Sequence, residues 1–309
     1  MRLRIGTRGS ALALWQSRHV AARLSAAHPD LQIELVEIAS KGDRITELPL
    51  SHVEGTGFFT AALEHVLVAG DIDVAVHSYK DLPVDSTAGL TVAAVPARGP
   101  VEDVLCSRDG LTLDRLPAGA RVGTCSTRRT AQVRQMRQDL EMIPLRGNVP
   151  TRVARVGRDL DAIVLARAGL VRLGLDTAIT ETFPIERMVP APAQGALAIQ
   201  CRAADVDVQR RLRVLDDAET RSAVDAERTM LHVLGGGCSV PVGALATAAA
   251  GGLALTGAVF DLSSGAALRV SLTGADSTAL GQLAAARLIE LGAGELLAAL
   301  AASPAGQPA

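Results

Sequence analysis

The 309-residue sequence predicts an α/β protein built from two similar lobes, followed by a smaller C-terminal α+β domain. Apolar runs such as GDIDVAVHS at 70–78 are typical of strands in sheets that are buried on both faces. That run is similar to RDLDAIVLA at 158–166, and RIGT at 4–7 is similar to RVGT at 121–124. These two similarities indicate a second unit related to the first. The last third of the chain changes to short alternating segments, which indicate a separate antiparallel domain.

The first lobe is expected to alternate strands with helices. Ser10 can cap a helix that runs to about Ala27, before Pro29. The segment 58–69 is apolar on one helical face and meets a stop signal at Gly70. The strands expected beside these helices lie at 3–7, 31–38, 71–78 and 90–96. In such a lobe a ligand is expected where the carboxyl ends of strands and the amino ends of helices meet.

Three domains follow from this order of elements. We expect domain 1 to comprise residues 1–96 with 195–216, domain 2 residues 97–194, and domain 3 residues 217–309. The segments rich in proline or alanine at 95–100 and from 190 are the expected crossings between the lobes. Domain 3 is expected to begin with a helix, to continue with three alternating strands, and to end with a helix at 280–302.

The charge balance and the cysteine spacing narrow the class of protein. The chain has 31 basic and 33 acidic residues and only 2% aromatic residues, which argues against a general nucleic-acid-binding surface. Its four cysteines form no CxxC pair, so neither a zinc site nor a dithiol redox motif is indicated, and a cytoplasmic location is expected. No apolar run approaches the roughly 20 residues that span a bilayer, so no membrane partner is expected.

Cationic and hydroxyl side chains collect at the ends of the expected strands. The first lobe contributes Arg8, Ser10 and Lys80, and the second contributes Thr124, Ser126, Arg128, Arg129, Arg146, Arg152 and Arg172. A single residue of this kind is usually a solvated surface group. Several arginines that converge on one cleft repel one another when it is empty, so the set indicates a ligand with several negative charges.

Asp81 is the exception in sign within this cationic set. It follows Lys80 in VHSYKDLP, and two interpretations are open: a turn residue that caps a local N–H before Pro83, or a general acid or base that faces the ligand. His77 in the same segment is expected to be a strand-end histidine satisfied by hydrogen bonds, because no second histidine stands at metal-ligand spacing. No metal site is expected.

The loop LGGGCSVP at 234–241 presents Cys238 behind three glycines. Glycine opens backbone angles that are closed to other residues, so this loop can bring its backbone close to a bound group. Cys106 and Cys201, in contrast, lie in apolar runs and are expected to be buried. From these residues alone, Cys238 is either a presented functional thiol or a loop cysteine without a role.

These segments resemble the porphobilinogen deaminase family, also called the hydroxymethylbilane synthases. The resemblance runs through IGTRGSALALWQ, VHSYKDLPV, VGTCSTRR, LRGNVPTR, AGLVRLG, APAQGALAIQCR and LGGGCSVPVG, in the family's order and across nearly the whole chain. It implies two lobes like those of periplasmic binding proteins and a third domain whose cysteine, here Cys238, holds a dipyrromethane cofactor through a thioether. It also implies a transferase that joins four porphobilinogen units head to tail with loss of ammonia and releases hydroxymethylbilane by hydrolysis.

The resemblance assigns roles to the candidate residues by position. Asp81 is implied to contact pyrrole nitrogens and to stabilise the azafulvene cation left when porphobilinogen loses ammonia. The residues implied to hold the cofactor, together with Cys238, are Lys80, Thr124, Ser126, Arg128, Arg129 and Arg146. The residues implied to bind substrate are Arg8, Ser10, Arg152, Arg172, Phe59 and Gln194. Charge-assisted bonds from the arginines suit the acetate and propionate groups of the pyrroles.

The sequence departs from the family pattern in two places. Thr56 and Thr60 stand in a segment where many relatives carry lysine, so a cationic lid is not implied, although Phe59 is still expected to cover the site. Cys125 stands where serine is usual, at an expected helix start where a thiolate is favoured. The neighbours of Cys125 match an anion-binding loop, so Cys238 stays the expected anchor, and the role of Arg167 stays open.

The expected protein is a monomeric cytoplasmic transferase of tetrapyrrole synthesis. One alternative is a two-lobed anion-binding protein without catalysis, and another is a Schiff-base enzyme that uses Lys80. The mass of the intact protein separates the transferase from the binding protein, because only the transferase carries an extra dipyrrole that the change Cys238→Ser removes.

Overall fold

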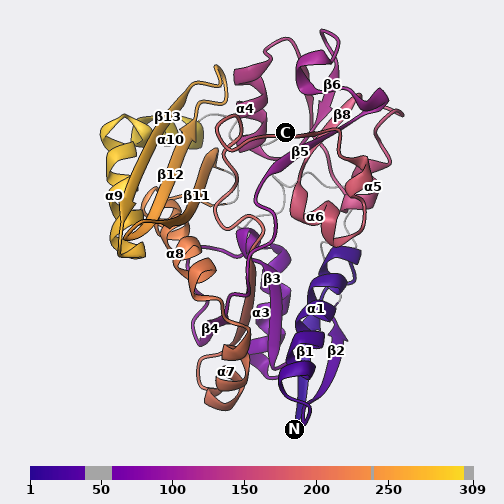
Figure 1. Ribbon diagram of the computed structural model, residues 1–309, viewed down its shortest axis with the longest axis vertical. Helices are drawn as coiled ribbons and strands as arrows, with labels where there is room; N and C mark the ends of the chain where they lie inside the picture. The colour runs from indigo at the N-terminus through magenta and orange to yellow at the C-terminus, as the bar shows by residue number, and fades with distance from the viewer. Residues whose placement is uncertain (39–57, 238–239, 303–309) are drawn as a thin grey trace. The chain divides into compact units, whose positions relative to one another are not determined.

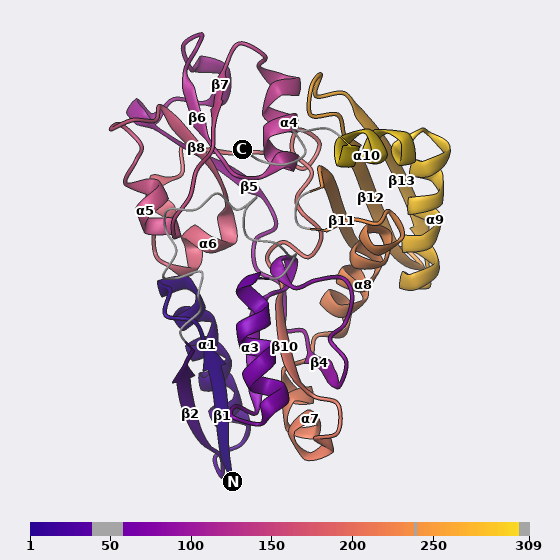
Figure 2. The ribbon, with the colours of Figure 1, turned by 180° about the vertical axis from the view of Figure 1, so that it is seen from behind.

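The described residues, 1–38, 58–237 and 240–302 of the computed structural model, fall into two units. One unit includes Met1–Arg98 and Ala196–Ser222, and the other comprises Gly99–Gly195 and Ala223–Ser303. Figure 1 shows the elements of each unit, and Figure 2 shows the same elements from behind. Within the described ranges, no helix combines the length and the apolar character needed to cross a membrane.

The first lobe is built on a five-stranded sheet with the order β2-β1-β3-β10-β4. Its strands are β1 (Arg2–Thr7), β2 (Gln32–Glu37), β3 (Val74–Ser78), β4 (Leu90–Ala94) and β10 (Leu197–Arg202). β1 pairs in parallel with β2 and β3, whereas β10 runs antiparallel to both β3 and β4. The four strands expected at the start of the chain are confirmed, and β10 enters between two of them from a distant part of the sequence.

Helices cover both faces of this sheet. They are α1 (Ala11–Ala27), α3 (Phe58–Ala69) and α7 (Val206–Leu212). Leu24 of α1 and Leu212 of α7 pack in the same apolar cluster as Leu3 and Ile199 of the strands. Leu63 of α3 packs in a second cluster, with residues of the opposite face. The sheet therefore lies between helices, which explains why its central strands are continuous apolar runs.

The second lobe repeats the arrangement of the first. Its sheet has the order β7-β6-β8-β5-β9. The strands are β5 (Asp103–Ser107), β6 (Arg121–Gly123), β7 (Glu141–Ile143), β8 (Ala162–Ala166) and β9 (Glu181–Thr182). Gly123 of β6 lies opposite Ile163 of β8, as Gly6 of β1 lies opposite Ala75 of β3. The internal repeat expected from RIGT and RVGT is therefore confirmed by the register of the strands.

Helices also lie on both faces of the second sheet. These are α4 (Thr127–Met136), α5 (Val149–Val153) and α6 (Arg167–Arg172). Val133 of α4 packs in one apolar cluster, whereas Val149 of α5 and Leu170 of α6 pack in another. Asn148 caps α5: its side-chain oxygen accepts a hydrogen bond from the Thr151 N–H at 2.9 Å.

The C-terminal part is an antiparallel sheet of β11 (Val242–Ala249), β12 (Gly252–Phe260) and β13 (Ala267–Gly274) with the helices α8 (Ala218–Val233), α9 (Ser277–Glu290) and α10 (Ala293–Ala302). The segment 280–302 is helical, as expected, apart from a break at 291–292, where Gly292 takes φ +103° and separates α9 from α10. The expected fold class is confirmed: two α/β lobes and a smaller α+β domain. The domain boundaries given above stay a prediction.

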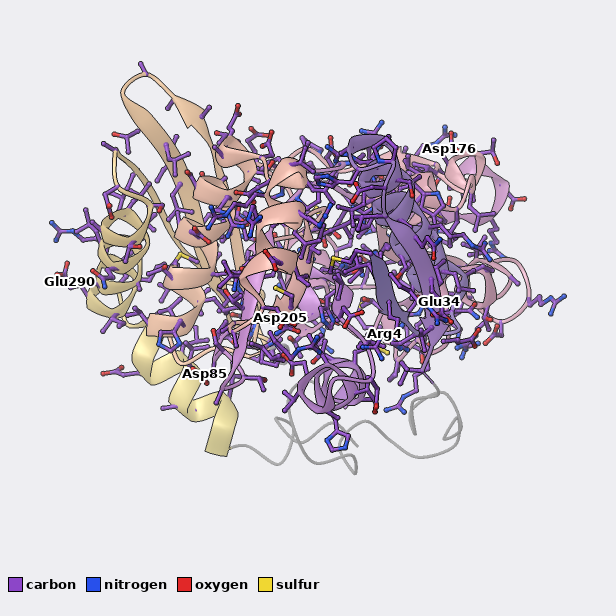
Figure 3. The ribbon with its side chains drawn as sticks, turned by 90° about the horizontal axis from the view of Figure 1, so that it is seen from below. Arg4, Glu34, Asp85, Asp176, Asp205 and Glu290 are labelled. Carbon is purple, nitrogen blue, oxygen red and sulfur yellow. The ribbon has the colours of Figure 1, made fainter. Side chains whose placement is uncertain are left out.

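Charged side chains at the amino ends of β1 and β3 pair with one another. Arg4 donates to both oxygens of Asp73, through Nε at 3.1 Å and Nη2 at 2.8 Å. Arg202, at the end of the antiparallel β10, donates to Asp73 at 3.1 Å and to Asp205 at 2.7 Å. Figure 3 labels Arg4, Asp205 and Glu34, which lies opposite Arg4 in the register of β2. The charged side chains at this end are thus paired with one another. The residues predicted to bind the ligand lie at the opposite ends of the strands.

Candidate functional site

The first lobe places Arg8 and Ser10 directly after β1, at the edge where β3 also ends. β1 and β3 are parallel neighbours, so their carboxyl ends meet at this edge. The Ser10 hydroxyl caps α1, as expected, by accepting a hydrogen bond from the Ala13 N–H at 3.3 Å. Gln16 of α1 donates to the Ser78 hydroxyl at 2.7 Å. This bond holds the start of α1 beside the end of β3.

A tight turn presents Asp81 to solvent. β3 leads into a 3₁₀ turn (Tyr79–Asp81). Tyr79 and Leu82 are buried, and the Tyr79 N–H donates to the Ala196 carbonyl at 3.0 Å. These residues anchor the turn, while Asp81 is exposed and Lys80 is half-buried. An exposed carboxylate on an anchored backbone suits a group that acts on a bound ligand.

His77 is a buried, hydrogen-bonded residue at the end of β3, as the sequence predicts. Its Nε2 lies 3.1 Å from Oε1 of Gln200 on β10. Burial lowers the pKa of His77 to about 4. Among the described residues, no group of three or more histidine, cysteine, aspartate or glutamate side chains is arranged to hold a metal ion.

In the second lobe, Arg128 and Arg129 share one buried carboxylate. Arg128 Nη1 donates to Asp103 Oδ2 at 2.7 Å, and Arg129 Nε donates to Oδ1 at 2.9 Å. Gln194 Nε2 donates to the same Oδ1 at 3.0 Å. Asp103 is fully buried, and the two arginines are only 3% and 6% exposed. The structure therefore brings three of the predicted site residues together on Asp103.

The group formed by Asp103, Arg128 and Arg129 carries an excess of positive charge. Guanidinium groups stay protonated in proteins, so one carboxylate neutralises only half of the charge of the two arginines. Burial lowers the pKa of Arg128; Asp103 acts against that shift, and the positive charge of Arg129 adds to it. A buried cation is costly unless it is paired. An anionic ligand at this group supplies the missing negative charge.

Two hydroxyl candidates hold the loop that precedes α4. The Thr124 hydroxyl accepts a hydrogen bond from the Ser126 N–H at 3.2 Å, and Ser126 caps α4 by accepting from the Arg129 N–H at 3.4 Å. Between them, the exposed Cys125 donates its thiol hydrogen to the Leu145 carbonyl. The hydroxyls therefore shape the loop that begins the arginine helix.

Of the other arginine candidates in the second lobe, Arg152 and Arg172 bind backbone carbonyls. Arg172 Nη2 donates to the Gly195 carbonyl at 2.6 Å, and burial lowers the pKa of Arg172 to about 10. Arg152 Nε donates to the Gly147 carbonyl at 2.7 Å. Arg146 lies half-buried in the loop before α5. Arg172 thus lies next to the segment that carries Gln194, whereas Arg146 lies in the loop before α5 and Arg152 lies in the last turn of α5.

Several predictions fall on residues that the structure does not describe. Cys238 lies outside the described residues, as does Thr56, and the side chain of Phe59 is likewise not described. The chain leading to Cys238 turns at Gly235, which has φ +66°. A Cβ atom on Gly236 would lie 2.4 Å from Cδ1 of Leu231 and 3.1 Å from the Leu231 carbonyl oxygen, so a side chain here would require its neighbours to shift.

Asp103 is the residue of this site that sequence reasoning missed. Its signal is an acidic side chain at the start of an apolar run, VLCS, that forms the buried strand β5. Aspartate is almost never fully buried unless it is paired. A buried-strand aspartate in a chain rich in arginine therefore indicates an ion pair, but the sequence does not indicate which arginine it binds.

The fold and these side chains define a class of protein. It has two α/β lobes, each with cationic residues at the carboxyl ends of its strands, and a C-terminal domain whose sequence includes a glycine-rich segment with a cysteine. Residues 3–210 match the family model "Porphobilinogen deaminase, dipyromethane cofactor binding domain", and residues 222–290 match "Porphobilinogen deaminase, C-terminal domain". The chain belongs to the porphobilinogen deaminase family.

Curated relatives agree with the family models over nearly the whole chain. A porphobilinogen deaminase of Xanthomonas oryzae pv. oryzae (strain PXO99A) is 46% identical over 301 residues, which cover 96% of this chain and 99% of the relative. One of Syntrophus aciditrophicus (strain SB) is 44% identical over 298 residues, which cover 96% and 97%. These matches confirm the resemblance, the enzyme class and the dipyrromethane cofactor expected from the sequence.

Comparison with solved structures gives weaker similarities. A nutrient-binding protein from Burkholderia cenocepacia bound to methionine is similar with a TM-score of 0.44 and 14% sequence identity, over 71% of this chain and 93% of that protein.

Proposed function

We propose that this chain joins four porphobilinogen units head to tail, with loss of ammonia, on a covalently attached dipyrromethane primer, and releases hydroxymethylbilane by hydrolysis. The observation that carries this proposal is the buried group of Arg128, Arg129 and Asp103, whose excess positive charge favours an anionic ligand. A dipyrromethane with acetate and propionate groups is such a ligand. Charge-assisted bonds from planar guanidinium groups both neutralise and orient carboxylates.

The residues present fit this cofactor. Bound through a thioether, the dipyrromethane supplies the free α-carbon to which the first substrate unit is joined. The residues proposed to hold it are Cys238, Lys80, Thr124, Ser126, Arg128, Arg129 and Arg146. Arg128 and Arg129 stand in the first turn of α4, where the partial positive charge of the helix end adds to theirs. Thr124 and Ser126 fix the backbone of the loop that carries this pair.

Asp81 is the proposed catalytic residue. Loss of ammonia from porphobilinogen leaves a cation whose charge spreads over the pyrrole nitrogen, and a carboxylate close to that nitrogen stabilises it. The structure supports this role because the turn after β3 is anchored by buried neighbours while Asp81 itself is exposed. The residues proposed to bind the substrate are Arg8, Ser10, Arg152, Arg172, Phe59 and Gln194.

The proposed setting is a monomer in the cytoplasm that uses neither nucleic acid nor a membrane. Its support is the balanced charge, the low aromatic content and the cysteine spacing of the sequence. We also retain the three proposed domains, 1–96 with 195–216, 97–194 and 217–309.

The change Asp81→Ala tests the proposal. Turnover is measured as ammonia released from porphobilinogen and as porphyrin absorbance after acid cyclisation and oxidation of the product. We expect the variant to lose at least about 100-fold in kcat, the usual scale for a positioned acid or base, with an unchanged melting temperature because the side chain is exposed. Asp71→Ala is the matched control, since Asp71 is an exposed aspartate that precedes β3. Ordinary turnover by the Asp81 variant would remove its assigned role.

A further inference from the structure

The segment at 189–195 contacts the group formed by Asp103 and its two arginines from both of its ends. The Val189 carbonyl accepts a hydrogen bond from Arg128 Nη1 at 2.6 Å. Near the other end of the segment, Gln194 Nε2 donates to Asp103 Oδ1 at 3.0 Å. The conformation of this segment therefore determines whether Gln194 reaches the carboxylate that the two arginines share.

The backbone of this segment is strained at Ala193, the residue before Gln194. Ala193 takes φ +60°, and among the described residues Asp109 is the only other non-glycine with a positive φ. This left-handed conformation is unfavourable for a residue with a Cβ atom, and alanine has no polar side chain that could compensate by bonding locally, as aspartate has. A strained conformation persists only where the surrounding structure holds it. Ala193 is fully buried, so its neighbours in the fold supply that support.

Glu227 of α8 binds the backbone at this strained position. Its Oε2 accepts a hydrogen bond from the Ala193 N–H at 2.6 Å, and its Oε1 accepts from the Ala246 N–H of β11 at 2.8 Å. Glu227 is fully buried. A carboxylate accepts hydrogen bonds at both oxygens, and its bonds to N–H groups are stronger than those of a neutral acceptor. One side chain thus binds both a strand of the C-terminal sheet and the residue that precedes Gln194.

We propose that Glu227 is a positioning residue, which holds Ala193 in its strained conformation and so keeps Gln194 on Asp103. The proposal rests on the proposed function, in which Gln194 binds the substrate and the two arginines hold the cofactor. Without the bond to Glu227, Ala193 is expected to relax to a negative φ, where an L-residue is more stable. This relaxation turns the chain at the residue before Gln194 and moves the Gln194 side chain away from Asp103.

The variant Glu227→Met tests the role of the carboxylate, because methionine has a similar length but lacks both acceptor oxygens. We expect the KM for porphobilinogen to rise about 5- to 10-fold, which corresponds to the loss of about one hydrogen bond. The kcat is expected to stay within about twofold of the wild type, because the variant loses substrate binding and keeps Asp81. Both constants are expressed per protein molecule that carries the dipyrrole, as counted from the intact mass.

Glu181→Met is the matched control. Glu181 Oε2 also accepts a hydrogen bond from a backbone N–H, that of Leu113 at 2.7 Å, in a loop that carries none of the proposed site residues. The control is expected to lower the melting temperature without raising KM, because a lost structural bond alone does not move Gln194.

A glycine at position 193 distinguishes a positioning role of Glu227 from a packing role. Glycine adopts a positive φ without steric cost, so the turn then depends less on its bond to Glu227. In an Ala193→Gly background, Glu227→Met is therefore expected to raise KM by less than about twofold. If Glu227 acted only through packing or through Ala246, KM would rise equally in both backgrounds, and that result would overturn the proposal.

Hydrogen exchange of the Ala193 amide gives a readout that does not depend on catalysis. The amide is expected to be protected in the wild type and to lose protection in Glu227→Met. A wild-type amide that exchanges as fast as an exposed one overturns the proposal even if Glu227→Met does not fold, and so does a folded Glu227→Met with the KM of the wild type. A wild type that consumes no porphobilinogen contradicts the proposed function instead, and the exchange rates still decide whether Glu227 holds Ala193.

Discussion

The change Asp103→Asn removes the negative charge on which two buried arginines depend. Asp103 accepts bonds from Arg128, Arg129 and Gln194, and none of its surface is exposed. An asparagine keeps one acceptor oxygen but turns an NH₂ group towards a guanidinium. Breaking a buried ion pair by removing one partner costs about 3–5 kcal/mol, because it leaves an uncompensated charge. We expect a loss of this size here.

The loss is measured as the change in unfolding free energy in urea and in melting temperature. For a unit of this size, a change of about 3–5 kcal/mol lowers the melting temperature by about 6–20 °C. The matched control is Asp159→Asn, which breaks an exposed pair with Arg155. Water screens exposed ion pairs and they contribute little to stability, so the control is expected to be nearly neutral.

The stability of the Asp103 variant also depends on added anions if the reasoning is correct. With its carboxylate removed, the arginine pair gains more from a bound dianion, so sulfate should recover part of the lost stability of Asp103→Asn and none in the control. If Asp103→Asn is as stable as Asp159→Asn, the buried ion pair does not make the expected contribution to the unfolding free energy.

Three further predictions concern acid stability, a backbone crossing and thiol reactivity. The pKa of His77 is lowered from 6.5 to about 4, so the histidine takes up a proton at a higher pH in the unfolded chain than in the folded protein. Acidification from pH 6.5 to 4 should therefore lower the unfolding free energy of the wild type by up to about 3 kcal/mol, and this loss should be absent from His77→Asn. Equal pH dependence of the two proteins would contradict this expectation. Gly195→Ala should lower the unfolding free energy of the protein by well over 1 kcal/mol, and by more than the control Gly119→Ala. Both glycines have positive φ, but only a Cβ atom on Gly195 would meet backbone oxygens, at 2.6 Å. Equal melting temperatures of the two variants would contradict this clash. In iodoacetamide labelling at pH 8, the exposed Cys125 should react in the folded protein. Cys106 should react only on unfolding, because burial raises its pKa to about 11. Labelled peptides identified by mass spectrometry in the reverse order would contradict these environments.

Elements with local signals could be predicted from the sequence. The cap at Ser10 depends on a residue three positions away, and it is confirmed. The relationship between RIGT and RVGT could be predicted because both strands have a glycine, Gly6 or Gly123, at the equivalent position of the register. Strand and helix positions in both lobes follow from such short-range patterns.

Long-range pairings could not be predicted in this way. The choice of Asp103 as the partner of Arg128 joins residues 25 positions apart, and the bond from Gln200 to Glu64 joins residues 136 positions apart. Both depend on the order of strands, because β5 and β10 run antiparallel within otherwise parallel neighbours. The sequence pattern of a buried strand is the same for either direction, so it does not indicate which side chains meet.

The mass of the intact protein tests the central claim most directly, because a thioether-linked dipyrromethane survives denaturation. The wild type and Cys125→Ser are each expected to exceed their sequence mass by one dipyrrole, and Cys238→Ser is expected to match its sequence mass. An excess that persists in Cys238→Ser, or its absence from a wild type that turns over porphobilinogen, would contradict the assignment of the cofactor to Cys238.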